Sequence, residues 1–228
     1  MFRFLKLQYI LIATSLVSMV TAIWIVFVAT PPETTMGVVQ RIFYFHVPSA
    51  WIAFLAFFIV CIASVAYLRT AKDFWDTLAL SSAEIGVLFT TLVLITGPLW
   101  ARPVWNTWWT WDARLTTTLV LWLIYVAYLM LRSFVEDKQR GPKLAAVFGI
   151  VGFIDVPIVY MSIRLWRTLH PSPVIGAGES GGLAPEMLRA LLISLFAFSL
   201  LYATLLWLRV QLGVLNKRIE RIREFKTN

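Results

Sequence analysis

Two histidines are the residues of this sequence with the most distinctive chemistry. His46 and His170 are the only histidines among 228 residues, and each lies close to the end of an apolar segment. Two imidazoles on opposite faces of a planar macrocycle form an axial ligand pair for haem iron. A structural zinc site needs four ligands, and no nearby cluster of Cys, Asp or Glu supplies the others. We therefore expect His46 and His170 to bind iron.

Tryptophan is concentrated between the two histidines. Five of the 11 tryptophans lie within twelve positions, namely Trp100, Trp105, Trp108, Trp109 and Trp111. Indole rings offer a broad apolar surface with little conformational entropy to lose, so the cluster predicts a flat shelf for a large planar ligand. The alternative is an aromatic belt at a membrane surface, where tryptophan is common.

The residues around this cluster predict how it is shaped. We expect Gly97-Pro98 to end the preceding helix and Pro103 to block its continuation. If residues 105–112 are helical, three tryptophans and Asp112 share one face. The sequence thus predicts a short amphipathic helix lying along the membrane within a loop of about residues 97–115.

A haem also carries two propionates, which favour arginine partners. The candidates close to the histidine or the shelf are Arg41, Arg102 and Arg114. The alternative for each is a solvated loop charge, and Arg114 has Asp112 as a local partner.

Composition indicates the elements that position these residues. The sequence is 60% hydrophobic and 14% charged, against about 25% charged residues in soluble domains. A membrane span needs about 20 apolar residues, and six segments qualify: about 7–28, 47–68, 78–95, 116–131, 144–161 and 187–208. We expect an all-α integral membrane protein whose residues 1–228 form one six-helix domain. The first segment is longer than a signal peptide's apolar region, which favours a retained anchor.

Lysine and arginine predict the orientation. With both termini in the cytoplasm, 14 of the 20 basic residues lie inside. Loops of about residues 29–46, 96–115 and 162–186 then lie outside, and they bring both histidines and the tryptophan cluster to one side. The basic tail, 209–228, is interpreted as a topology signal that contacts lipid head groups, not nucleic acid.

Two other functions are compatible with such a protein. Glu84 and Asp155 lie in or near apolar segments, where acids often mark ion routes, so a permease or channel is one alternative. Their other interpretation is a polar contact between helices. A b-type electron carrier is the second alternative. The single cysteine, Cys61, excludes an internal disulfide and a C-x-x-C-H attachment site for c-type haem.

Three stretches carry a resemblance to a known family. Residues 108–116 (WWTWDARLT) resemble the WWD signature of haem-handling membrane proteins. Residues 41–51 (RIFYFHVPSAW) and 166–170 (WRTLH) resemble one branch, the cytochrome c maturation protein C family (CcmC, haem exporter protein C). The similarity runs from the first span to the sixth. Ala101 and Asn106 depart from the family's Trp-Gly pattern.

The resemblance implies a function in the bacterial inner membrane. Such proteins bind haem b transiently at the periplasmic face and present it to the haem chaperone CcmE. They work with the small membrane protein CcmD and the ABC transporter subunits CcmA and CcmB. It implies that His46 and His170 are the axial ligands and that the tryptophans and Asp112 form the shelf and docking surface. The sequence has no phosphate-binding loop, so we expect a haem-transfer component rather than an enzyme or the ATPase.

Overall fold

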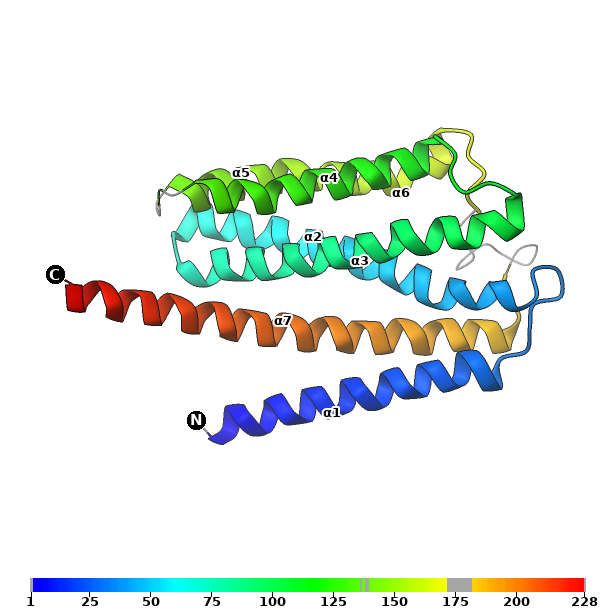
Figure 1. The fold of residues 1–228 in the computed structure, drawn as a ribbon, viewed down its shortest axis with the longest axis horizontal. Coiled ribbons are helices and arrows are strands. Elements are labelled where there is room, and N and C mark those ends of the chain that lie inside the picture. Colours follow the sequence, from blue (N-terminus) through cyan, green and yellow to red (C-terminus); the bar gives the residue numbers. More distant parts are fainter. Residues whose placement is uncertain (1, 136, 138–139, 172–181, 228) are drawn as a thin grey trace.

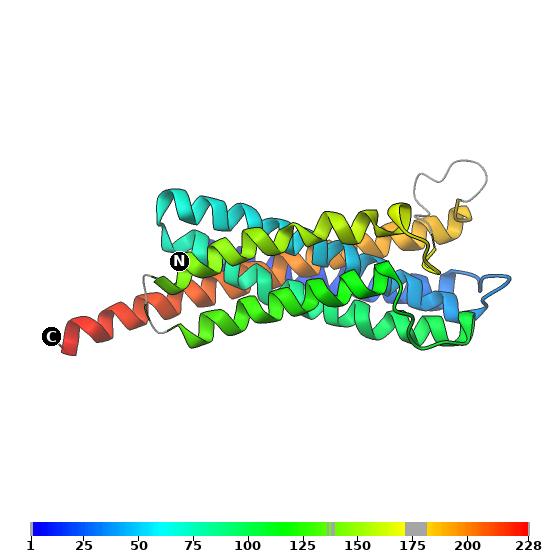
Figure 2. The same ribbon diagram turned by 90° about the horizontal axis from the view of Figure 1, so that it is seen from above.

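A computed structural model of the chain describes residues 2–135, 137, 140–171 and 182–227. Long helices run side by side along one axis (Figure 1, Figure 2). The helices are α1 (Phe2–Trp24), α2 (Phe43–Thr70), α3 (Asp73–Trp105), α4 (Ala113–Phe134), α5 (Arg140–Phe153), α6 (Asp155–Leu165) and α7 (Pro185–Thr227). A π-helical turn, Ile25–Ala29, follows α1, and a 3-10 turn, Val38–Ile42, precedes α2. The described residues contain no strand.

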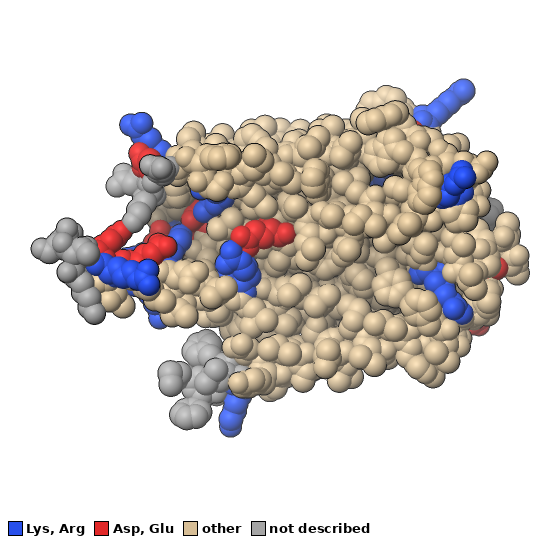
Figure 3. Space-filling model, viewed as in Figure 1, with Lys and Arg blue, Asp and Glu red and all other residues tan. Residues whose placement is uncertain are grey.

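The prediction of six membrane-spanning helices is confirmed. Within the described residues, six helical stretches are long and apolar enough to cross a membrane: Lys6–Ala29, Val38–Thr70, Asp73–Trp105, Ala113–Phe134, Arg140–Leu165 and Pro185–Glu224. Charged residues gather toward the two ends of the molecule and leave a mostly uncharged band between them (Figure 3). Such a band is what a hydrocarbon core of about 30 Å requires.

The two ends of the bundle differ in what they carry. Both chain ends lie at the same end, which we call the terminal end (Figure 1). The opposite end, here the histidine end, holds the connections after α1, α3 and α6. Of the predicted third outside loop, residues 172–181 lie outside the described residues. The basic tail continues α7 as a helix to Thr227.

The third helix corrects a prediction. Gly97-Pro98 does not end it, because α3 continues through Pro98 and Pro103 to Trp105. Proline is tolerated in membrane helices, since neighbouring groups can satisfy the carbonyls it leaves without a donor. The amphipathic helix predicted at residues 105–112 is also wrong, because residues 106–112 are not helical. The second helix also differs from its predicted start: α2 begins at Phe43 instead of Val47, so His46 lies in its first turn.

The fifth span consists of two helices, α5 and α6, which are interrupted at Ile154. Pro157 explains the break, because it has no N–H to donate to the carbonyl of Phe153 and its ring crowds that carbonyl. The amide of Ile154 instead bonds the carbonyl of Val151 at 3.1 Å, a tighter turn than an α-helix. The two halves can therefore pack against different helices.

Close packing in the centre of the bundle and ion pairs at its terminal end hold the helices together. The rings of Phe57 on α2 and Tyr125 on α4 are stacked with centroids 3.7 Å apart. A Cβ on Gly86 of α3 would lie 2.5 Å from the Phe57 ring, so only glycine permits this approach. At the terminal end, buried Asp76 of α3 pairs with Arg132 of α4 and Lys217 of α7, each at 2.7 Å. The helices are thus fastened at the end opposite the histidines.

Candidate functional site

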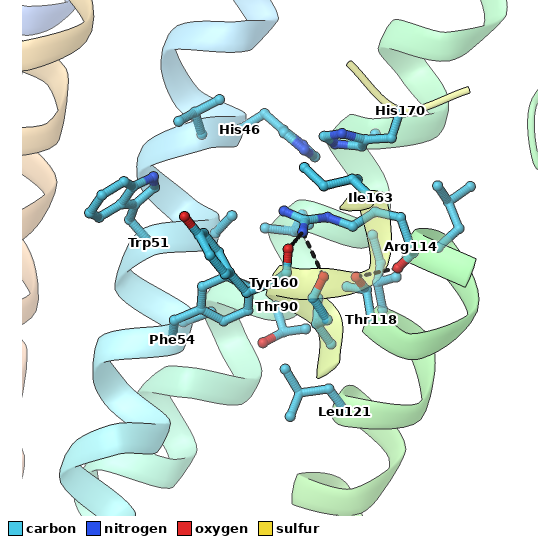
Figure 4. A pocket seen from close by; sticks show the side chains of 18 of the residues that line it. His46, Trp51, Phe54, Thr90, Arg114, Thr118, Leu121, Tyr160, Ile163 and His170 are labelled. Carbon is cyan, nitrogen blue, oxygen red and sulfur yellow. Dashed lines mark hydrogen bonds between the residues drawn. The ribbon is translucent and has the colours of Figure 1, made fainter. Parts of the chain in front are cut away.

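The structure brings the two histidines together. His46 on α2 and His170, which follows α6, point toward one another across the top of a cavity (Figure 4). Both side chains are half-buried. No group of three or more His, Cys, Asp or Glu able to hold a metal ion occurs among the described residues. The pair by itself offers two nitrogen ligands.

Hydrogen bonds assign the tautomer of each ring. Nδ1 of His46 lies 2.8 Å from Oγ1 of Thr96, whose single hydrogen is donated to the carbonyl of Leu92 at 2.6 Å. Nδ1 of His46 must therefore be the donor. In His170, Nδ1 donates to the carbonyl of Pro171 at 2.9 Å. Both rings keep the Nε2 lone pair, which is the arrangement that fixes a ligating histidine.

The protonation state of His170 suits a ligand. Burial, together with the nearby Arg114 guanidinium, lowers the pKa of His170 below its ordinary value of 6.5, although the bond to Pro171 acts in the opposite direction. The imidazole is consequently neutral at pH 7. A neutral imidazole is the form that binds a metal.

The cavity below the histidines has a volume of about 660 Å³ and a mostly apolar lining. That volume is within the range of about 300–1,000 Å³ usual for cofactor sites. α2, α3, α4 and α6 form its walls, and it reaches down to Phe54, Thr90 and Leu121 (Figure 4). Its shape and apolar lining suit a large planar ligand better than an ion.

The five clustered tryptophans divide into two groups. Trp100, Trp105 and Trp109 line the cavity, and the rings of Trp100 and Trp105 meet edge to face at 4.8 Å. Trp108 and Trp111 are exposed and do not line it. The Nε1 atoms of Trp100 and Trp109 are buried without a hydrogen-bond partner in the described structure. Their contribution to the cavity wall is therefore the apolar surface of the rings.

Short polar contacts hold the tryptophan-bearing connection in place. Asn106 adopts the left-handed conformation, with φ of 55°, and ends α3. Asparagine tolerates this region better than most residues, so it serves where the family resemblance leads one to expect glycine. Arg102 donates to the backbone and side-chain oxygens of Asn106 at 2.9 and 2.7 Å. Asp112 caps α4 by accepting from the amide of Leu115 at 3.0 Å.

Only one of the three candidate arginines faces the cavity. Arg114 lines it and donates to the carbonyls of Val159 and Tyr160 at 2.7 and 3.4 Å (Figure 4). It is not held by Asp112, which is engaged in capping. Arg102 caps α3 instead, and Arg41 lies over the ring of Phe27 at 5.4 Å, outside the cavity. Asp112 does not line the cavity either.

The two acids of the permease alternative lie outside the cavity. Glu84 pairs with Arg209 of α7 through two contacts, at 2.6 and 2.7 Å, so it joins α3 to α7 as a polar helix contact. Asp155 begins α6, and its Oδ2 atom is buried without a hydrogen-bond partner in the described structure. Neither residue is among those that line the cavity with the histidines.

Sequence reasoning missed several residues of the site. Thr96 orients His46, while Thr118 and Tyr160 line the cavity beside Arg114. Thr96 directly precedes the Gly97-Pro98 pair, and in the sequence that pair indicates only the end of a helix. Tyr160 lies on α6, three residues after the proline that breaks the span. Helical periodicity does not indicate which polar residues face an internal cavity.

Comparisons with known proteins give the family context. The family model described as Heme exporter protein C matches residues 3–224. The chain is 38% identical over 193 residues to the Heme exporter protein C of Bradyrhizobium diazoefficiens, covering 84% of this chain and 73% of that protein. It is 32% identical over 205 residues to the Heme exporter protein C of Escherichia coli K12, covering 90% and 82%. A ccmC-like mitochondrial protein named for cytochrome c biosynthesis, from Marchantia polymorpha, is 38% identical over 160 residues, covering 70% and 66%.

Proposed function

Because this chain belongs to the Heme exporter protein C family, which implies haem handling in cytochrome c maturation, we propose that it holds haem b between His46 and His170. The observation that carries the proposal is the geometry of the two imidazoles. Each has its Nδ1 engaged and its Nε2 free, and they face one another at the top of a cavity of about 660 Å³. Two strong nitrogen ligands keep the iron six-coordinate and the ring fixed in orientation.

The polar groups of the cavity suit the propionates. One nitrogen of Arg114 donates to the backbone of α6. Because a guanidinium has five N–H donors, the others can bind a carboxylate. Trp100 and Trp109 line the same cavity. The same two side chains and Trp105 supply apolar surface to the macrocycle.

The exposed tryptophans suit a different role. Trp108 and Trp111 present large apolar rings at the histidine end without lining the cavity. Such residues are typical anchors of protein interfaces. We assign them to docking of the chaperone CcmE, which receives haem at the periplasmic face while CcmD, CcmA and CcmB act in the same complex. The chain itself holds and positions haem, and most of its contribution is orientation.

Haem quantitation with chaperone loading tests the proposal. His46→Ala and His170→Ala are purified after co-expression with CcmE and compared with the wild type. We expect less bound haem in each variant and loss of haem transfer to CcmE, because each removes one axial ligand. Trp24→Ala is the control, since this exposed tryptophan on α1 lies outside the cavity. Full haem content and full CcmE loading in either histidine variant would overturn the proposal.

The permease alternative predicts a different result. If Glu84 and Asp155 form an ion route, substitution of both would abolish transport while haem content stays unchanged. The pairing of Glu84 with Arg209 favours a structural role instead.

A further inference from the structure

The cavity is not enclosed on all sides by protein. Several of its lining residues are also exposed on the outer surface of the bundle: Trp51 by 53%, Leu55 by 40% and Phe58 by 47% on α2, and Tyr160 by 45% on α6. A residue that both lines a cavity and reaches the surface belongs to its rim. These four residues, which we call the rim, therefore mark an opening in the side of the bundle between α2 and α6.

The break in the fifth span produces this opening. In the terminal half of the bundle α5 packs against α2, and the rings of Phe58 and Phe153 close the gap with centroids 5.8 Å apart. α5 also contacts α4, and beyond Ile154 α6 keeps the packing against α4 but not the packing against α2. Among the described residues, α6 and α2 are hardly in contact. The opening thus begins above Phe58 and Phe153 and continues toward the histidines.

The position of the opening indicates what surrounds it. The rim residues belong to the segments long and apolar enough to span the membrane, Val38–Thr70 and Arg140–Leu165. All four side chains are largely apolar, with a single hydroxyl on Tyr160 and a single indole N–H on Trp51. An opening of this composition at this depth faces acyl chains, since charged groups gather toward the ends of the molecule (Figure 3).

We infer that the gap between α2 and α6 is a lateral portal through which haem enters the cavity from the lipid leaflet at the histidine end. This inference rests on the proposed function. Haem is planar with two apolar faces, so it dissolves in acyl chains and can slide edge-on between two helices. Trp51 and Tyr160 then flank its path, and Arg114 lies deeper in the cavity to receive a propionate (Figure 4).

A graded obstruction of the portal tests the inference. Leu55→Phe and Leu55→Trp enlarge the side chain at the rim. Each variant and the wild type are reconstituted separately in lipid nanodiscs. Haem is added, and the Soret change gives the rates of loading and release. Obstruction of a path raises its barrier in both directions. We therefore expect loading and release to slow together, by about tenfold or more for tryptophan and less for phenylalanine, with little change in Kd.

Leu88→Trp is the matched control. Leu88 on α3 matches Leu55 in its distance from the histidine end. Gly97 of α3 lies beside the His46 ring of α2, and Leu88 and Leu55 are each nine residues from that level. Leu88 is exposed like Leu55 but does not line the cavity. Its loading rate should equal that of the wild type.

The outcomes separate the two proposals. If wild-type protein takes up no haem, the proposed function fails and the portal with it. If wild-type protein loads and both Leu55 variants load at the same rate, only the portal is overturned. A weaker Kd with unchanged loading rate also overturns it, because Leu55 is then a contact of bound haem and not part of its path. If the tryptophan variant does not fold, the phenylalanine variant decides.

Discussion

At the scale of single residues, the site is defined by which donors and acceptors are already engaged. Thr96 and Pro171 each take the Nδ1 hydrogen of a histidine, so both Nε2 atoms are left to bind a metal. Trp100 and Trp109 line the cavity, and their Nε1 atoms are buried without a hydrogen-bond partner in the described structure. The sequence predicts the pairing of His46 with His170, because orientation and loop positions bring them to one side. It does not predict the threonine that orients one of them.

Arginine shows the limit of sequence reasoning at this scale. By their positions along the chain, Arg41, Arg102 and Arg114 are all candidate propionate partners, with Arg114 favoured. Only Arg114 lines the cavity. The direction of a long side chain depends on the packing of α4 against α6, which a single sequence does not reveal.

Arg114→Gln tests the propionate assignment. We expect haem to bind about 10- to 100-fold more weakly, because a hydrogen bond to a charged group contributes about 1.5–3 kcal/mol. Haem dimethyl ester, which has no carboxylates, should bind both proteins alike. Titration followed by absorbance measures both affinities, and Arg164→Gln on the exposed side of α6 is the control. An equal loss for haem and its ester would assign Arg114 to tethering α6 alone.

At the scale of elements, apolar length predicts the six spans well, while their ends depend on local chemistry. α3 continues ten residues beyond its expected end at Ile95, to Trp105, because prolines are tolerated within a bundle. The tryptophan segment is not helical, since Asn106 ends α3 and Asp112 caps the start of α4. With only residues 106–112 between them, no room remains for a separate helix.

Asp76 is expected to hold three elements together. It is buried and pairs with Arg132 and Lys217, whereas Asp73, one turn earlier on α3, is exposed. Asp76→Ala leaves two cations without their buried partner, which should lower the free energy of unfolding by about 3–5 kcal/mol. Asp73→Ala should cost about 1 kcal/mol or less, as exposed pairs do. Thermal unfolding in detergent compares them, and equal melting temperatures would contradict this account.

At the scale of the whole molecule, charge and the positions of the chain ends predict the orientation in the membrane. Both ends of the chain lie at one end of the bundle (Figure 1). The excess of lysine and arginine, 14 of 20, falls on that side by sequence position, which predicts that it faces the cytoplasm. The histidine end, with its exposed tryptophans, then faces the periplasm.

Single cysteines test this orientation. In a Cys61→Ala background, Thr34→Cys places a thiol in the exposed connection at the histidine end, and Asn216→Cys places one on the exposed surface of α7 at the terminal end. A membrane-impermeant thiol reagent added to spheroplasts should label the first and not the second. After permeabilisation both should react. Labelling of Asn216→Cys alone in intact spheroplasts would reverse the orientation and move the haem site to the cytoplasmic face.

The central claim is that both histidines bind one iron, and electron paramagnetic resonance of the ferric haem-loaded protein tests it most directly. The account predicts a low-spin spectrum for the wild type, because two imidazoles give a strong ligand field. His46→Ala and His170→Ala should each turn the remaining haem high-spin, and added imidazole should restore the low-spin signal. A low-spin spectrum that persists unchanged in either variant without imidazole would contradict the assignment of that histidine.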